Sequence, residues 1–112
     1  MSIEVACIPV TPAETVSGGW GKAPAVAVAK VQNGGIVSWR IENVGWDALH
    51  DSGTEGSHHA MIVRFLTENG VTIVVANHMG PPMQNTLAKM GIRVVLDATG
   101  DARRAIQDAI TS

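Results

Sequence analysis

The stretch Val74–Pro82, which reads VVANHMGPP, joins two different kinds of pattern. Its first apolar residues are typical of a buried strand, and the two prolines behind Gly80 are typical of the first turn of a helix. His78 and Met79 stand at the junction. In an open α/β sheet, ligands gather beyond the carboxyl end of a strand. The stretch therefore predicts a strand–turn–helix unit with a candidate binding residue at the turn.

The rest of the chain divides into strands and helices in the order βββαβαβα. Predicted strands cover residues 3–10, 25–31, 36–44, 71–76 and 92–99, and predicted helices cover 58–70, 80–91 and 100–110. Asn33-Gly34 predicts a tight hairpin, because both residues tolerate positive φ. Val37, Trp39 and Ile41 alternate with polar residues, which predicts one packed and one wet face. We expect a five-stranded mixed sheet with helices on both faces, since crossovers are right-handed.

Length and composition favour one soluble α/β domain that spans residues 1–112. The apolar fraction is 46%, the charged fraction is 16%, and the formal net charge is −2. Without a basic stripe, a nucleic-acid partner is not expected. Cys7 is the only cysteine, which excludes an intrachain disulfide and a zinc site of several thiolates. No signal peptide or membrane span is evident. We expect a cytoplasmic protein that is a monomer or a weak homodimer.

Three segments resemble the dinitrogenase iron–molybdenum cofactor biosynthesis family, which includes NifX-like and NifB C-terminal-like domains. Residues 70–106 follow the family pattern of an apolar strand, a turn to a glycine and a helix, then a Gly-Ile pair into the next strand. The matching positions are Gly80, Leu87, Gly91 and Ile92. Residues 16–31, VSGGWGKAPAVAVAKV, resemble the first-loop pattern, and residues 57–71, SHHAMIVRFLTENGV, resemble the segment before the first helix.

The resemblance implies a ribonuclease H-like three-layer α/β/α fold. It also implies that some members carry iron–molybdenum cofactor precursors or other metal–sulfur clusters. His58 matches a histidine that the family often has before the first helix. The first loop departs from the family, because Gly19 stands where many members have histidine.

The candidate ligands lie in three segments. His78 and His58 are the candidate metal ligands, because imidazole suits borderline metals. The other candidate cofactor-binding residues are His59, Met79, Gly80, Trp20 and Gly21. Structural alternatives stay open for several of them. His78 would cap a turn, Met79 would fill the core, Trp20 would anchor its loop instead of covering a cleft, and one histidine of the pair would be solvated.

Cys7 is expected to be a buried, inert thiol, and His50 a solvated loop residue. A nuclease of this fold needs carboxylates clustered at strand ends, and the acidic residues are scattered. No phosphate-binding loop or nucleophile motif is present. We therefore expect no catalysis.

Two functions remain. In the first, the protein carries an iron–molybdenum-type or other metal–sulfur cluster between a donor and an acceptor protein. In the second, it is a regulatory module that binds a small anionic metabolite or a protein partner without metal. Both place the ligand in a crevice that His78 shares with the loop of residues 11–24 and with His58-His59.

Overall fold

The computed structural model describes residues 3–48 and 55–111. Its strands are β1 (Ile3–Pro9), β2 (Val26–Gln32), β3 (Gly35–Glu42), β4 (Ile73–Val75) and β5 (Arg93–Val95), and its long helices are α2 (Glu55–Glu68), α3 (Pro81–Lys89) and α4 (Ala102–Thr111). This order confirms the prediction. Residues 46–48 add a helical stretch where an irregular loop was expected. The loop histidine His50 lies outside the described residues.

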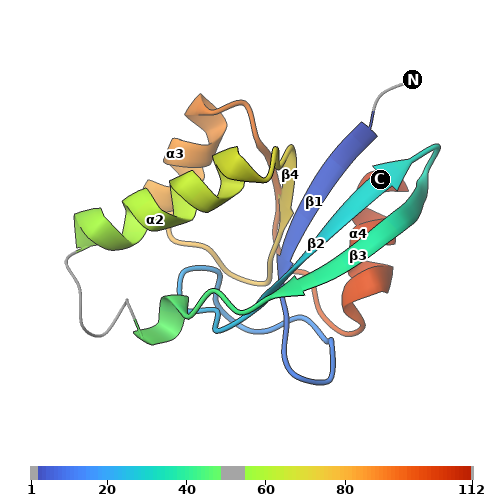
Figure 1. Ribbon diagram of the computed structural model, residues 1–112, viewed down its shortest axis with the longest axis horizontal. Helices are drawn as coiled ribbons and strands as arrows, with labels where there is room; N and C mark the ends of the chain where they lie inside the picture. Colours follow the sequence, from blue (N-terminus) through green and yellow to red (C-terminus); the bar gives the residue numbers. More distant parts are fainter. Residues whose placement is uncertain (1–2, 49–54, 112) are drawn as a thin grey trace.

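The sheet has five strands in the spatial order β3-β2-β1-β4-β5 (Figure 1). The central strand β1 is antiparallel to β2 and parallel to β4, and β4 is parallel to β5. The predicted hairpin between β2 and β3 is confirmed, because Asn33 and Gly34 have φ values of 55° and 77°. Since β1, β4 and β5 run in the same direction, the loops that follow them meet at one edge of the sheet. We call this the carboxyl edge.

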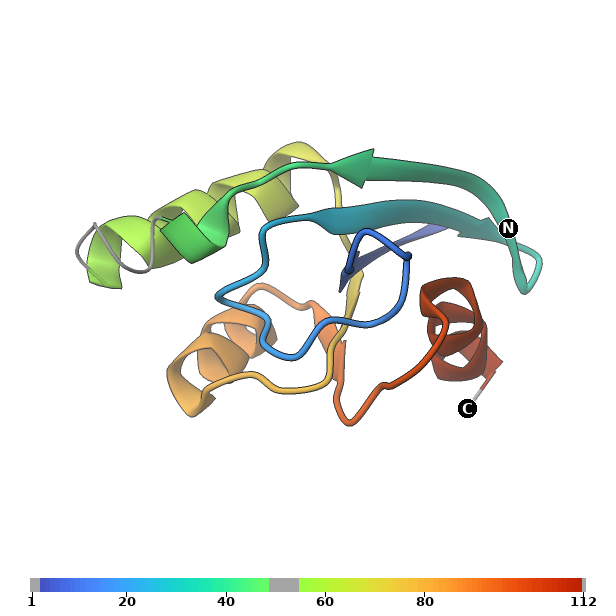
Figure 2. The ribbon, with the colours of Figure 1, turned by 90° about the horizontal axis from the view of Figure 1, so that it is seen from below.

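Helices cover both faces of the sheet, which confirms the three-layer α/β/α architecture (Figure 2). Helices α2 and α3 cover one face and bury Ile62, Leu66 and Leu87 against residues such as Val74. Helix α4 covers the other face, where Ile106 packs among small residues of β1 and β2. Full burial of a large aliphatic side chain contributes about 1.5–3 kcal/mol. Successive residues of β1 and β4 point to opposite faces of the sheet, so each of these two strands contributes side chains to the core on both faces.

The edge strand β3 differs from the prediction of a packed face. Val37 is 59% exposed and Ile41 is 40% exposed. β3 lies at the end of the sheet, and the pairing register with β2 shifts between Lys30 and Val31, which breaks the regular alternation at this edge. Of the β3 side chains, Ile36 and Trp39 pack against the core that α4 covers. The Trp39 indole N–H donates to Glu14 Oε1 at 2.7 Å, and the Arg103 guanidinium lies 4.4 Å above the indole ring.

Several element boundaries also differ from the prediction. Helix α2 begins three residues earlier than predicted, and β5 spans only three residues. The chain leaves the sheet soon after β5 because Asp97 adopts the left-handed region, with φ at 65°. None of the described helices is long and apolar enough to span a membrane.

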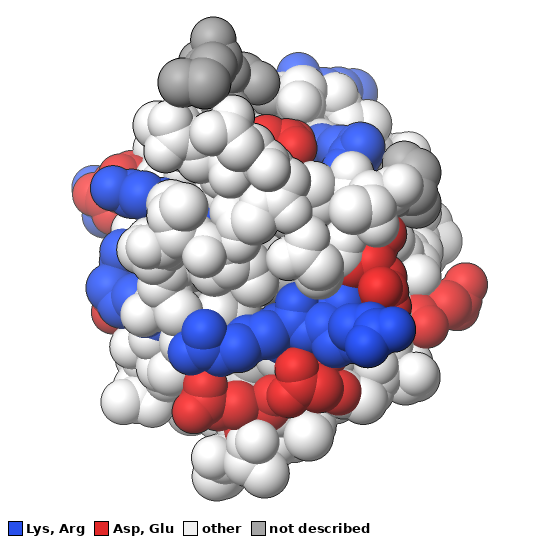
Figure 3. Space-filling view, turned by 90° about the vertical axis from the view of Figure 1, so that its right-hand side faces the viewer, with Lys and Arg blue, Asp and Glu red and all other residues white. Residues whose placement is uncertain are grey.

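The face over the β2–β3 hairpin and α4 carries charges of both signs. Figure 3 shows acidic and basic side chains in adjacent bands on this face. The Arg104 Nε and Asp108 Oδ1 atoms, one helical turn apart, form an ion pair at 3.2 Å. The basic band on this face is therefore bordered directly by acidic side chains.

Candidate functional site

The loop after β1 contacts the turn after β4 at the carboxyl edge. Gly19 and His78 form a parallel bridge. The Trp20 N–H donates to the His78 carbonyl oxygen at 3.0 Å. The pairing between the β1 and β4 segments thus resumes beyond the strands themselves. These contacts fix the backbone of His78 in place.

A side chain from the first turns of α2, that of His58, contacts the same loop. The His58 Nε2 atom lies 2.5 Å from the Gly21 carbonyl oxygen. A carbonyl only accepts hydrogen bonds, so Nε2 carries the proton of this bond. A Cβ atom added to Gly21 would lie 3.2 Å from His58 Cε1, closer than most such contacts, so glycine permits the close approach. The three segments that the sequence expected to converge therefore meet around Trp20 and Gly21.

The side chains of His78 and Met79 lie in opposite environments. His78 is exposed, whereas Met79 is 3% exposed and belongs to the core beneath α2 and α3. The Met79 carbonyl accepts a hydrogen bond from Gln84 Nε2 at 2.8 Å. Gly80 caps α3, and Pro81 occupies its first turn. The structure thus places the Met79 thioether in the core, as its packing alternative expects, and leaves the His78 imidazole accessible.

A row of aromatic rings holds the loop from the inside. The rings of Trp20 and Trp46 meet at a centroid distance of 5.0 Å, and those of Trp46 and Phe65 at 5.7 Å. Trp20 is 1% exposed. Its ring therefore anchors the loop from inside and does not cover a cleft at the surface. Its Nε1 atom is buried and has no hydrogen-bond partner among residues 3–48 and 55–111. Such a donor costs about 1–3 kcal/mol, which the burial of the ring must offset.

His59 lies beside His58 but in a different setting. It is half-buried, and the two ring centroids are 6.0 Å apart. Asn77 connects the ends of β4 and β5, since its Nδ2 donates to the Ala98 carbonyl at 3.1 Å and its own carbonyl accepts from the Asp97 N–H at 3.1 Å. The turn that carries His78 is therefore braced from the β1 side and from the β5 side.

The described residues contain no group of three or more His, Cys, Asp or Glu side chains that would hold a metal ion. Cys7 is fully buried, and this burial raises the pKa of its thiol well above the ordinary range, against a smaller lowering effect of Arg40. The expectation of an inert thiol agrees with this burial. The described part of the chain therefore offers isolated imidazoles and backbone groups to a ligand, not a complete coordination shell.

The sequence analysis placed His78, His58 and the loop of residues 11–24 around one site, but it did not predict the contacts between them. It did not anticipate that the Gly21 carbonyl is the partner of His58. Nor did it connect Trp46 with Trp20, because the two residues are far apart in the chain and only the fold brings their rings together. The sequence signal for the contact between His58 and Gly21 was a glycine next to a tryptophan, because glycine lets another group approach the backbone closely.

Solved structures with the same fold have low sequence identity to the chain. The apo form of the orange protein from Desulfovibrio gigas is 17% identical, with a TM-score of 0.77 over 96% of this chain and 88% of that chain. PH0822 is 16% identical, with a TM-score of 0.76 over 96% and 90%. The Thermotoga protein TM1290, of the DUF35 family, is 23% identical, with a TM-score of 0.66 over 96% and 87%.

No curated protein matches the sequence significantly. The family model described as dinitrogenase iron-molybdenum cofactor matches residues 1–112. This match covers the full sequence, and the three-layer fold agrees with it. The chain therefore belongs to the dinitrogenase iron–molybdenum cofactor family.

Proposed function

We propose that the protein carries a metal–sulfur cluster of the iron–molybdenum type as cargo at the carboxyl edge. The exposed His78 imidazole would be the protein ligand of the cluster. The observation that carries this proposal is the position of His78. Its ring is accessible, while its backbone is held by the Gly19 bridge and the Trp20 N–H. A ligand on a fixed backbone is favourable for binding because little conformational entropy is lost.

The donor set fits a cluster better than a bare metal ion. A bare zinc or iron ion needs three or four protein ligands, and no such group occurs in the described residues. A cluster brings its own sulfide ligands and leaves few metal positions for the protein. A neutral imidazole suits such a borderline metal. Few protein ligands also favour release, which a carrier requires.

His58 has a different role in this proposal from the direct ligation that the sequence suggested. Its Nε2–H is directed at the Gly21 carbonyl, so ligation through that nitrogen would break the bond. We assign His58 to positioning the Gly19–Gly21 segment, which in turn holds His78. His59 and the backbone of residues 19–21 would border the cargo. Met79 would support the turn from the core.

Family membership supports cofactor binding over catalysis. The scattered carboxylates of the sequence agree with this view, because hydrolysis or nuclease chemistry with two metals requires clustered acidic ligands. Partners in this proposal are the proteins that deliver the cluster and receive it. The exposed His78 is accessible to both.

The test is loading with isolated iron–molybdenum cofactor under anaerobic conditions. Metal content and the visible spectrum are measured after removal of unbound cofactor. We expect His78→Ala to lose most of the bound metal and His58→Ala to bind more weakly. The control is Asn85→Ala, which changes an exposed polar residue of α3. If His78→Ala loads like the wild type with the same spectrum, His78 is not the ligand. If the wild type binds no cofactor, the metal-free binding module becomes the better interpretation.

A further inference from the structure

The chain contains two asparagine–glycine pairs, and the fold places them in contrasting settings. Asn33-Gly34 forms the tip of the β2–β3 hairpin (Figure 1), and Asn69-Gly70 follows the end of α2. In such a pair the asparagine side-chain amide is easily lost, because glycine has no Cβ to obstruct an attack by its own nitrogen. The two pairs therefore share a reactive sequence and differ in structure.

The reaction is an intramolecular displacement followed by hydrolysis. The glycine nitrogen attacks the side-chain carbonyl carbon of the asparagine and closes a succinimide ring. The side-chain nitrogen leaves as ammonia and takes the glycine amide proton with it. Water then adds to either ring carbonyl and breaks its bond to the ring nitrogen, which gives aspartate or isoaspartate. Water is the only co-reactant, and no group is oxidised or reduced.

At the hairpin tip both reacting groups lack intramolecular partners. Asn33 and Gly34 are exposed. Within residues 3–48 and 55–111, the Asn33 side chain makes no hydrogen bond and the Gly34 N–H has no backbone acceptor. Solvent water, which the hydrolysis step consumes, has direct access to the tip. The attacking nitrogen and the attacked amide are therefore both available.

At the end of α2 the same two groups are held. Asn69 is half-buried, and its Nδ2 donates to the Phe65 carbonyl at 2.8 Å. Its Oδ1 accepts from the Arg40 guanidinium at 2.5 Å. The Gly70 N–H donates to the Thr67 carbonyl at 3.2 Å. Ring closure here has to break contacts of both the attacked amide and the attacking nitrogen, so the fold protects this pair.

The turn at the hairpin tip has to open before the ring closes. Asn33 has a φ of 55°, and in this left-handed region the following nitrogen points away from the asparagine Cβ. An opening confined to the tip is sufficient, and exposed ends of this kind open at little cost. From outside the hairpin, Gln107 Nε2 of α4 donates to the Gly34 carbonyl. This contact therefore opposes the opening.

We propose that Asn33 is a site of spontaneous deamidation, whereas the fold protects Asn69. The two products differ in their effect on the hairpin. Asp-Gly supports the same turn as Asn-Gly, so the aspartate product keeps the hairpin. Isoaspartate lengthens the main chain inside a two-residue turn, which no longer matches the pairing of Gln32 with Gly35. Either product adds one negative charge at neutral pH.

The tip is remote from the site proposed for the cluster. Ile3, the first residue of β1, pairs with Gln32 just before the tip. The tip therefore lies beside the amino end of β1, and the carboxyl edge with His78 lies at the other end of this strand. Deamidation can be measured on the apoprotein, so failure of either proposal leaves the other intact.

The experiment is a time course of the folded apoprotein in H₂¹⁸O at mildly alkaline pH. Samples are transferred to ordinary water, digested with trypsin and analysed by mass spectrometry. Peptide 31–40 reports Asn33, and fragment ions of peptide 65–89 report Asn69. We expect Asn33 to incorporate heavy oxygen and to give two chromatographic forms, isoaspartate and aspartate. Asn69 should react at least about tenfold more slowly, the effect of one or two net hydrogen bonds.

A denatured control and three variants identify the cause of the difference. In concentrated urea the two asparagines should react at similar rates. Gln107→Ala should speed the reaction of Asn33 about threefold, the effect of one weak hydrogen bond, and leave Asn69 unchanged. Arg40→Ala should speed only Asn69, and Asn33→Gln should remove the signal from residue 33.

Three results would each overturn the proposal. They are equal rates at the two asparagines of the folded protein, a faster reaction at Asn69, and an unmodified Asn33 after a time in which the urea-denatured chain converts fully. Because the measurement is made on the wild type, none of these results depends on whether a variant folds.

Discussion

The Nε2 atom of His58 lies 2.5 Å from the carbonyl oxygen of Gly21, so a side chain of α2 holds the loop that braces His78. His58 is only 6% exposed. Water therefore has little access to replace the bond if the imidazole is removed. This relationship makes His58 a residue on which both stability and the proposed site depend.

His58→Ala is expected to lower the free energy of unfolding by about 2 kcal/mol, because the Gly21 carbonyl loses its donor and the ring leaves a space in the core. Urea denaturation measures the change. The matched control is His59→Ala, which removes a neighbouring half-buried imidazole and should cost less than about 1 kcal/mol. Equal losses for the two variants would contradict the structural role of His58.

Gly21→Ala tests the same contact from the loop side. The added Cβ would lie 3.2 Å from His58 Cε1, so the ring or the loop must shift by a few tenths of an ångström. We expect a loss of about 1–2 kcal/mol from this overpacking. Gly18→Ala is the control, because a Cβ atom added at Gly18 would have no neighbouring atom within 4 Å and the backbone there is not left-handed. Thermal denaturation of both variants gives the comparison.

The combination of Gly21→Ala with His58→Ala refines this test. Removal of the ring relieves the clash, so the two losses should add to more than the loss measured for the double variant. Strict additivity would show that Gly21 is needed for a reason other than the close approach of His58.

Met79 and His78 are neighbours for which we predict opposite effects. Met79→Ala should cost about 2–4 kcal/mol, because Met79 is 3% exposed within the core. His78→Ala should change stability by less than about 0.5 kcal/mol, because its ring is exposed. Urea denaturation of the apoproteins separates the two. A large loss for His78→Ala would mean that the ring supports the turn, which is the structural alternative for this residue.

The sequence predicted the fold well because its strongest signals are local. Asn33-Gly34 specifies its hairpin whatever surrounds it, and the apolar run before Asn77 is typical of a strand buried on both faces. The packed face assigned to Val37 and Ile41 was wrong. Alternation in a strand shows which residues share a face, but the neighbours that cover this face depend on the position of the strand in the sheet.

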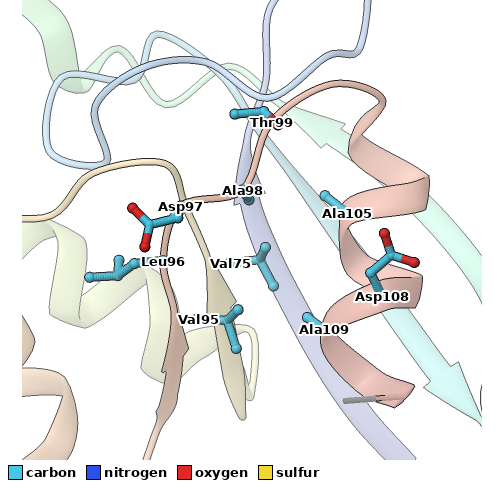
Figure 4. Close-up of a pocket in the computed structure, with 9 residues that line it drawn as sticks. All are labelled: Val75, Val95, Leu96, Asp97, Ala98, Thr99, Ala105, Asp108 and Ala109. Carbon is cyan, nitrogen blue, oxygen red and sulfur yellow. The ribbon is translucent and has the colours of Figure 1, made fainter.

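The site was predictable to a lesser degree for a related reason. The resemblance and the strand-end rule located His78 and His58 at one edge. Neither could show which ring nitrogen is used, because the partner of His58 is a backbone carbonyl 37 residues away. The hollow that Val75, Val95, Ala105 and Ala109 line between the sheet and α4 (Figure 4) was also absent from the prediction. It depends on how short side chains of α4 meet β4 and β5, a property of packing that no periodicity records.

The stability of the protein should fall at alkaline pH through Cys7. Burial raises the pKa of the Cys7 thiol in the folded state, with Arg40 opposing to a smaller extent. In the unfolded chain the thiol ionises near a pKa of about 8.5. Below that pH both states hold the proton, and the stability is complete. Above it only the unfolded state releases the proton, so the free energy of unfolding falls as pH rises toward the folded-state pKa.

The slope from this one group approaches about 1.4 kcal/mol per pH unit. Other groups also titrate in this range, so the informative quantity is the difference between the wild type and Cys7→Ala. Urea denaturation at several pH values from about 7 to 10 should show that the variant loses less stability than the wild type above the unfolded-state pKa. The variant will start from a lower value, because alanine is smaller than cysteine, but that offset does not depend on pH. Parallel curves for the two proteins would mean that Cys7 ionises equally well in both states, which its burial in β1 does not allow.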